Sequence, residues 1–164
     1  MGKKRVWFVL GALLLVVCLV AVFFRYFAPQ AATMLDEPPS TDVQSGTVIK
    51  RGQFTGGDAA HEASGRVTLI RHGQSHSLRF EGYHATNGPD VFFFLSKSPE
   101  GDFDAADHVR VLVPRGAGAG QATLRGNFAV ELPELAEPGE YESLIAWCVR
   151  FRHRFGWAKL TAAE

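Results

Sequence analysis

An uncharged apolar run from Val6 to Phe24 is the feature that most limits how this chain can fold. It has about 19 residues, which is enough for a helix to cross the hydrocarbon core of a bilayer. Three basic residues precede the run (Lys3, Lys4 and Arg5), and only Arg25 follows it closely. Because positive charge favours the cytoplasmic side, residues 1–5 are predicted to stay in the cytoplasm and the C-terminal part to lie outside it. The sequence therefore predicts a single-pass protein of the cell membrane, anchored in the bilayer by residues 6–24.

A cleaved signal peptide is the alternative interpretation of this N-terminus. The apolar region of a signal peptide has about 7–15 residues and ends in small residues. Here the run is longer and ends in Phe23 and Phe24, which favours a retained anchor. Residues 28–32 contain small side chains where cleavage can occur, so a secreted mature domain stays open as the alternative.

The rest of the chain divides into a linker and one domain. Residues 25–45 are polar and contain prolines without apolar periodicity, which is typical of a linker. Residues 46–160 are enough for one domain that buries its own core. The chain has 17 basic and 17 acidic residues, so no overall charge attracts a nucleic acid. We therefore predict no nucleic-acid partner.

The pattern of apolar residues in this domain predicts short strands joined by turns. Residues 66–70 and 77–82 flank a turn at residues 72–75, as in a β-hairpin. Residues 91–95 form a continuous apolar run, as in a strand buried on both faces. Apolar and other residues alternate along residues 128–132. With no amphipathic helix evident, we predict an all-β fold, an antiparallel β-sandwich or barrel-like domain, preceded by one N-terminal transmembrane helix.

Cys148 is the most distinctive residue of the domain, because the only other cysteine, Cys18, lies in the apolar run. We interpret residues 141–152 as one strand, in which Cys148, Arg150 and Arg152 share a face. A nearby guanidinium favours the thiolate. A thiolate can ligate haem iron, bind another soft metal or exchange with disulfides. The alternative is an inert core residue, because free cysteine is among the residues most often buried.

The six histidines offer further ligands. His61 and His153 are candidates for a second ligand to a group held by Cys148, and haem is a candidate cofactor. The other four are expected in exposed turns: His72, His76, His84 and His108. The basic residues around His153 form either a solvated strand face or a site for an anionic group such as a haem propionate.

Several short segments together resemble a known family. They are Gly52–Phe54, Gly88–Asp90 and, most specifically, Tyr141-x-Ser-Leu-Ile-x-Trp-Cys148-x-x-Phe151. Their order and spacing resemble the DM-thirteen domain, also called the electron-transfer DM domain, over residues 46–160. The resemblance implies an all-β domain outside the cytoplasm, in which a single cysteine serves redox transfer as a bare thiol or a haem ligand. That cysteine corresponds to Cys148. The chain departs from the family pattern at Val130, where an aromatic residue is expected, and in the loop of residues 115–120.

Three functions are compatible with these features. We predict a membrane-anchored extracytoplasmic domain that transfers electrons through Cys148 to an unidentified redox partner protein. The alternative is a non-catalytic binding or interaction module in which Cys148 is structural core. A thiol oxidoreductase is disfavoured, because the chain has no Cys-x-x-Cys and the domain has no second thiol to resolve a mixed disulfide.

Overall fold

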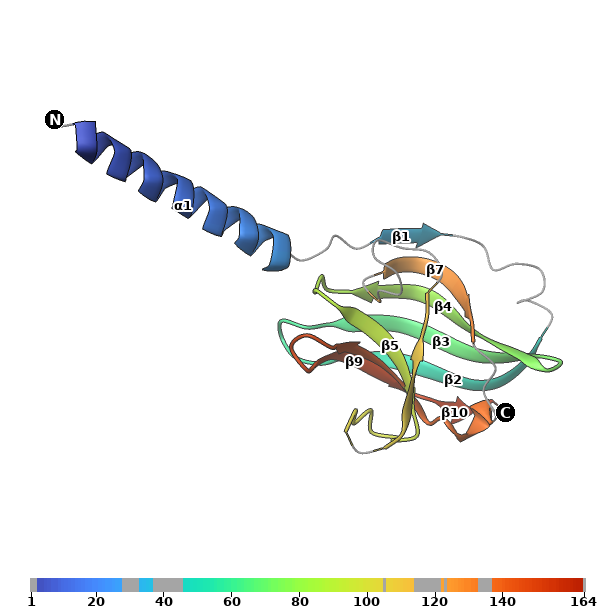
Figure 1. Cartoon of the computed structure of the whole chain (residues 1–164). Coiled ribbons are helices and arrows are strands. Elements are labelled where there is room, and N and C mark those ends of the chain that lie inside the picture. Colours follow the sequence, from blue (N-terminus) through green and yellow to red (C-terminus); the bar gives the residue numbers. More distant parts are fainter. Residues whose placement is uncertain are drawn as a thin grey trace.

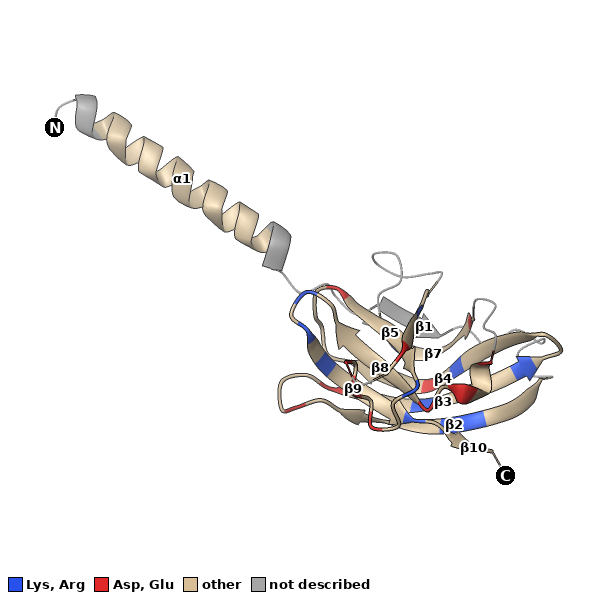
Figure 2. Ribbon diagram, turned by 60° about the horizontal axis from the view of Figure 1, so that its bottom comes forward, with Lys and Arg blue, Asp and Glu red and all other residues tan. Residues whose placement is uncertain are grey.

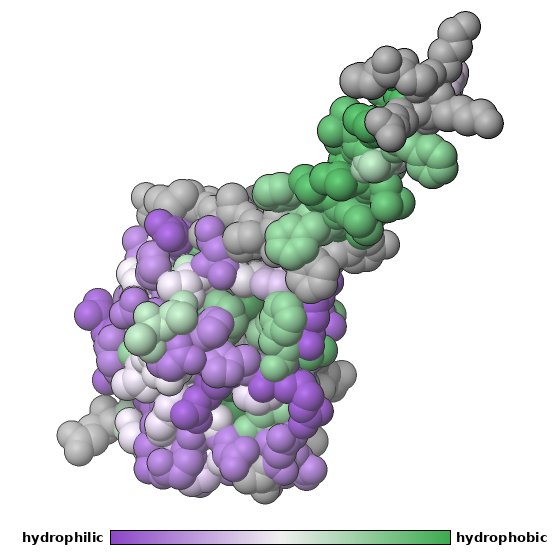
Figure 3. All heavy atoms as spheres, turned by 90° about the vertical axis from the view of Figure 1, so that its left-hand side faces the viewer, coloured by the Kyte–Doolittle hydropathy of each residue, from purple (hydrophilic) through white to green (hydrophobic). Residues whose placement is uncertain are grey.

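The N-terminal segment forms one long helix. The computed structural model describes residues 3–27, 33–36, 46–104, 106–113, 122, 124–132 and 137–163. Helix α1 spans Lys3–Phe27, and within it Val6–Phe24 is long and apolar enough to cross a membrane, as an anchor or a signal sequence does. Apolar side chains cover the visible face of this helix (Figure 3). A helix that is apolar all round suits lipid better than water, which agrees with the predicted anchor.

The domain is built almost entirely from strands. A short 3₁₀ helix, η1 (Pro138–Glu140), lies before β8. The strands are, in chain order, β1 (Thr33–Asp36), β2 (Thr47–Gly56), β3 (Ala63–His72), β4 (Ser75–Ala85), β5 (Val91–Ser96), β6 (His108–Val111), β7 (Leu124–Glu131), β8 (Ser143–Cys148), β9 (His153–Lys159) and β10 (Thr161–Ala162).

These strands form one curled sheet in the order β1-β7-β4-β3-β2-β9-β8-β5-β6, and β10 pairs with β2. The pairings are antiparallel, except that β1 runs parallel to β7. Strand β2 joins the two halves: residues 47–53 pair with β3, and residues 54–56 pair with β9. The sheet therefore folds over on itself like half a barrel (Figure 1), which confirms the predicted antiparallel, barrel-like fold.

An aromatic cluster fills the space between the two halves. Phe80 and Tyr83 come from β4, and Phe93 comes from β5 in the opposite half. The ring of Phe80 lies 4.8 Å from that of Phe93 and 4.5 Å from that of Phe128, centroid to centroid. Phe54 of β2 contacts Tyr83 at 5.1 Å. Burying such large rings is the main favourable term in this fold.

The sequence predicted most of these strands correctly. The expected hairpin is β3–β4, and its two turn residues are Gly73 and Gln74, between the paired His72 and Ser75. Gly73 has φ of 63°, a conformation that glycine adopts without steric cost. The apolar run of residues 91–95 lies in β5, and residues 128–131 lie in β7.

The prediction of one strand over residues 141–152 is wrong. Strand β8 ends at Cys148, a turn covers residues 149–152, and β9 begins at His153. Arg152, in this turn, has φ of 48°, which is not a strand conformation. Val149 and Phe151 are consequently exposed.

Within the predicted linker of residues 25–45, Thr33–Asp36 forms the short strand β1 beside residues 124–127 of β7. The expectation for four of the histidines is wrong. His72, His76, His84 and His108 lie in strands rather than in turns. Each pairs with a neighbouring strand, so its backbone is ordered by the sheet.

Basic residues lie along β2, β3 and β4 with acidic residues among them (Figure 2). Glu81 of β4, for example, lies 3.4 Å from the Nε of Arg66 and 3.6 Å from that of Arg79. Such exposed pairs contribute little to stability. They do balance the local charge, in keeping with a chain of no net charge.

Candidate functional site

Cys148 ends β8 with its thiol inside the core. The residue is 1% exposed and belongs to the main apolar cluster. Its Sγ donates a hydrogen bond to the carbonyl oxygen of Pro89 at 2.9 Å. Val91 of β5 and His153 of β9 are its partners on the two neighbouring strands. The sulfur is therefore held in one position, in surroundings that keep water and other thiols away.

The arginines that were expected beside Cys148 lie in the turn after it. The Nε of Arg150 donates to Asp90 at 2.7 Å, and an Nη2 of Arg152 lies 3.1 Å from both carboxylate oxygens of Asp104. The predicted strand face shared by Cys148 and Arg150 does not exist, because the strand ends at Cys148. Arg150 therefore gives no support for a thiolate at Cys148.

The residues around Cys148 do not fit a haem. Iron ligation would require the metal to approach Sγ directly. The sulfur is enclosed by core side chains and is hydrogen-bonded to Pro89. We therefore derive no chemistry through a haem at this position.

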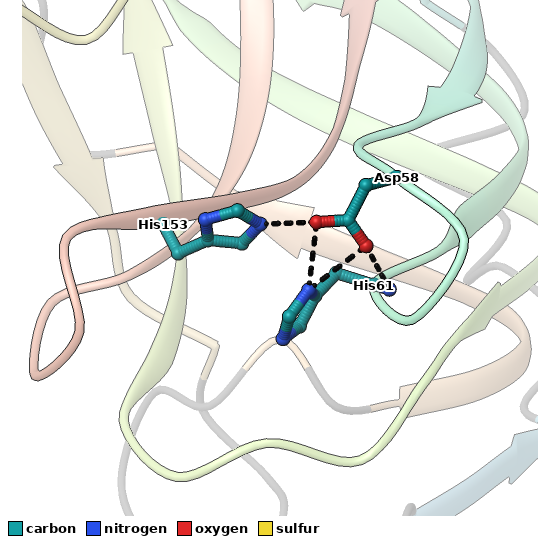
Figure 4. A group of neighbouring side chains, drawn as sticks. All are labelled: Asp58, His61 and His153. Carbon is teal, nitrogen blue, oxygen red and sulfur yellow. Dashed lines mark hydrogen bonds and ion pairs between the residues drawn. The ribbon is translucent and has the colours of Figure 1, made fainter.

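A polar cluster lies where the β2–β3 loop meets the start of β9. Asp58 and His61 come from the loop, and His153 is the first residue of β9 (Figure 4). The Nδ1 of His61 lies 3.0 Å from each carboxylate oxygen of Asp58, and the Nε2 of His153 lies 2.7 Å from Asp58 Oδ2. The two imidazole rings are 4.3 Å apart, centroid to centroid. One carboxylate thus holds two histidines together.

The β2–β3 loop is tightly constrained around this carboxylate. Asp58 Oδ1 accepts hydrogen bonds from the amides of Ala60 and His61, at 2.7 and 2.8 Å. The amide of Gly57 donates to the carbonyl of Phe155 at 2.9 Å, which ties the loop to β9. A Cβ at position 57 would lie 2.0 Å from the carbonyl oxygen of Arg154. Only glycine allows this close approach.

Hydrogen bonding also fixes the charge of the carboxylate. The side chain of His61 and the amide of Ala60 hold the pKa of Asp58 well below its usual range, with smaller contributions from the amide of His61 and from His153. Asp58 is exposed, so water screens part of this effect. The carboxylate remains ionised in ordinary solution, and it presents a negative charge to both imidazoles.

A surface hollow with a volume of about 500 Å³ adjoins the cluster. Trp147 and Phe103 form one wall, with rings stacked 4.6 Å apart and only 4° from parallel. His153 lines the hollow too, together with Gly57, Glu100, Gly101, Asp102, Arg152 and Arg154. Trp147 is half-buried, so the residue beside Cys148 in the sequence faces a site that small molecules can reach.

Comparison with known proteins places this site within a family. A family model described as "Electron transfer DM13" matches residues 53–160, more than half of the chain. The chain belongs to the electron transfer DM13 family. No curated protein and no solved structure matched it significantly. The DM13 match confirms the resemblance seen in the sequence, and its range includes Cys148, the polar cluster and the hollow.

The contacts between the predicted site residues of the DM13 domain differ from those that the sequence suggested. His61 and His153 lie together, as candidate ligands should, but their shared partner is Asp58. Cys148 is paired with His153 through the backbone, while its thiol is bonded to Pro89. Sequence reasoning missed Asp58 and Phe103. The Asp58-x-x-His61 spacing in a glycine-rich loop was the available signal for Asp58.

Proposed function

We propose that this DM13 protein is a membrane-anchored electron-transfer protein, with its β domain outside the cytoplasm and Cys148 as its redox group. Membership of the electron transfer DM13 family supports the activity. The apolar helix α1 supports the anchor, and the basic residues before it support the orientation. The observation that carries the assignment of Cys148 is the match to the electron transfer DM13 family, which includes this residue as the single cysteine of the matched range.

Burial of the thiol disfavours reactions at the sulfur atom itself but allows electron transfer. Disulfide exchange and stepwise oxidation of sulfur both require direct access to the sulfur atom, which a residue that is 1% exposed does not give. Electron transfer needs no contact between donor and acceptor. In the proposed step, Cys148 gives one electron to a one-electron oxidant, the redox partner, and its proton leaves along the hydrogen bond to Pro89, which is partly exposed, and passes to solvent water. The sulfur radical returns to the thiol by taking up one electron and one proton.

A second candidate is a binding module in which Cys148 only packs the core. The same burial favours it, because Cys148 lies in the main apolar cluster with neighbours such as Val91 and Phe155. The ligand would then occupy the hollow beside Trp147. The two candidates differ in one property, which is whether the sulfur exchanges electrons.

Stopped-flow oxidation of the purified full chain separates the two candidates. The protein is mixed with a coloured one-electron oxidant such as hexachloroiridate, and the loss of colour reports the electron that leaves the protein. We expect fast oxidation of the wild type and at least about tenfold slower oxidation of Cys148→Ala. Trp147→Phe is the control, since tryptophan is also oxidisable, and it should keep the fast phase. Equal rates for wild type and Cys148→Ala, with both folded, would make Cys148 a packing residue and favour the binding module.

The anchor and its orientation are tested separately. Mass spectrometry of the mature N-terminus should find residues 6–24 retained, and a new N-terminus within residues 28–32 would show a secreted domain instead. Reporter fusions at the C-terminus should be active outside the cytoplasm. Cytoplasmic activity of the fusion would reverse the proposed orientation.

A further inference from the structure

The cluster of Asp58, His61 and His153 offers three metal-ligating side chains at one point of the surface. One ligand atom from each, an imidazole nitrogen or a carboxylate oxygen, lies within 4.8 Å of the other two. Figure 4 shows both histidine rings directed at the carboxylate. Among the described residues, this is the only group of three or more histidine, cysteine or acidic side chains with that spacing. The thiol of Cys148 takes no part in this cluster, and its hydrogen bond goes to Pro89.

We propose that Asp58, His61 and His153 bind a divalent transition-metal ion. Two imidazoles and one carboxylate form a ligand set that suits zinc, copper, iron and nickel, rather than magnesium or calcium, which prefer oxygen ligands alone. Such metals bind histidine nitrogen and carboxylate oxygen at about 2.0–2.2 Å. Two donors at that distance from one ion, and at right angles to each other, are about 3 Å apart.

The spacing in the cluster is close to this value. The histidine nitrogens lie 2.7–3.0 Å from the carboxylate oxygens of Asp58. The two histidine nitrogens lie within 4.8 Å of each other, so side-chain rotations that bring them closer would place one ion between the three residues. On binding, each of these ring nitrogens turns its lone pair toward the ion, and the neutral imidazole carries its proton on the other nitrogen.

The cluster is also held in place before any ion arrives. Backbone amides of Ala60 and His61 fix one oxygen of Asp58. The ring of His61 packs edge-on against the buried Phe155, 4.7 Å away between centroids. A ligand set that is ordered in advance loses less conformational entropy on binding.

Open coordination positions are the chemical consequence of having three protein ligands. Catalytic metal sites keep such positions for water or substrate, whereas structural zinc sites are closed by a fourth protein ligand. The three side chains are 37–42% exposed, so water reaches the ion. Because His153 also lines the hollow beside Trp147, a small molecule in that hollow lies next to the bound ion.

The proposal is tested with untagged full chain in detergent, freed of metal by a chelator and then titrated with Cu²⁺ alone and with Zn²⁺ alone. Calorimetry should show one saturable site per chain for each metal, with Cu²⁺ bound more tightly, as the order of divalent metal affinities requires. Electron paramagnetic resonance of the Cu²⁺ complex should show hyperfine coupling to two imidazole nitrogens. No saturable binding, or a spectrum without nitrogen coupling, would overturn the proposal.

Variants locate the site. His61→Gln and His153→Gln should each weaken binding at least about tenfold and remove one nitrogen from the spectrum, and both keep a side chain of similar size. His84→Gln is the matched control, because His84 is a histidine of β4 that does not belong to the cluster, and it should bind as the wild type does. Cys148→Ala should also bind normally, which separates this site from the proposed redox thiol. Unchanged binding in both cluster variants, or equal weakening by His84→Gln, would contradict the assignment.

Discussion

The buried thiol and the histidine cluster occupy paired positions on one hairpin but meet opposite surroundings. Cys148 of β8 and His153 of β9 are partners across the strands. Cys148 is 1% exposed and bonds to Pro89, whereas the side chain of His153 is 42% exposed and bonds to Asp58. One hairpin therefore carries, side by side, a site closed to water (the dry site, at Cys148) and a site open to water (the wet site, at His153). Chemistry that needs only electrons can use the first, and ligands from solvent can use the second.

Phe155 and the loop before β5 keep the two regions distinct. Phe155 is 3% exposed, and its ring contacts His61. The loop of Gly88, Pro89 and Asp90 packs closely over it: a Cβ on Gly88 would lie 2.4 Å from Cζ of Phe155. The same loop supplies the carbonyl of Pro89 that accepts the thiol hydrogen bond. We therefore expect the close packing at Gly88 to keep solvent away from the thiol of Cys148.

The largest expected effect comes from opening the core itself. Phe93→Ala removes a fully buried ring between the two halves of the sheet, and it should lower the free energy of unfolding by about 3–5 kcal/mol. Chemical denaturation of the full chain in detergent measures the loss. A cost below about 1 kcal/mol would mean that the two halves do not pack around this ring.

A change at Gly88 tests the difference in solvent access between the two regions, because it should let water reach the thiol of Cys148. Gly88→Ala forces the ring of Phe155 to shift and should cost about 1–3 kcal/mol. It should also speed the reaction of Cys148 with a thiol reagent in the folded protein. Gly139→Ala is the control, since a Cβ there has open space around it. Unchanged thiol reactivity in Gly88→Ala would show that this loop does not seal the sulfur.

A smaller effect, present near neutral pH and lost in acid, is expected on the wet side. The hydrogen bonds of His61 and nearby amides lower the pKa of Asp58 in the folded state. A lowered carboxyl pKa contributes stability that is present above the unfolded value of about 4 and is lost as the pH falls toward the folded value. Wild type should therefore be more stable than Asp58→Asn at pH 5, and the two melting temperatures should converge below about pH 4. A difference that stays constant down to pH 2 would refute this role of the carboxylate.

The smallest effect concerns His76, which lies on the β3–β4 hairpin away from both regions. Burial, followed by the charges of Arg71 and His72, lowers the pKa of His76. The unfolded chain then binds this proton more readily, so stability should fall as the pH drops below about 6.5. His76→Gln should show a shallower fall between pH 8 and pH 5.5 in denaturation midpoints. An equal slope in the variant would mean that His76 contributes nothing to this dependence.

The fold was largely predictable because its signals are local. Alternation in residues 77–82, the apolar run at 91–95 and the glycine turn at 73 each reflect a property of one strand or turn. The end of β8 was not predictable in this way. The alternating pattern continues through residues 149–152, but the chain turns there, with φ of 48° at Arg152. The arginines of this turn bond to Asp90 and Asp104, which lie far away in the sequence.

The candidate site was only half predictable, for the same reason. Cys148 stands out in any reading of the sequence, because it is the domain's single cysteine. The partnership of His61 with His153 depends on the pairing of β2 with β9, which brings residues about ninety positions apart together. No spacing rule in the sequence could join Asp58 to His153.

Voltammetry of the full chain in a lipid film tests the central claim that Cys148 exchanges electrons while it stays buried. We predict a reversible one-electron wave in the voltammogram of the wild type and no such wave for Cys148→Ala. Both proteins should give the same β-rich circular dichroism spectrum. A wave of equal size in Cys148→Ala, or a silent wild type with an intact thiol, would contradict the claim and leave Cys148 as a packing residue of the core.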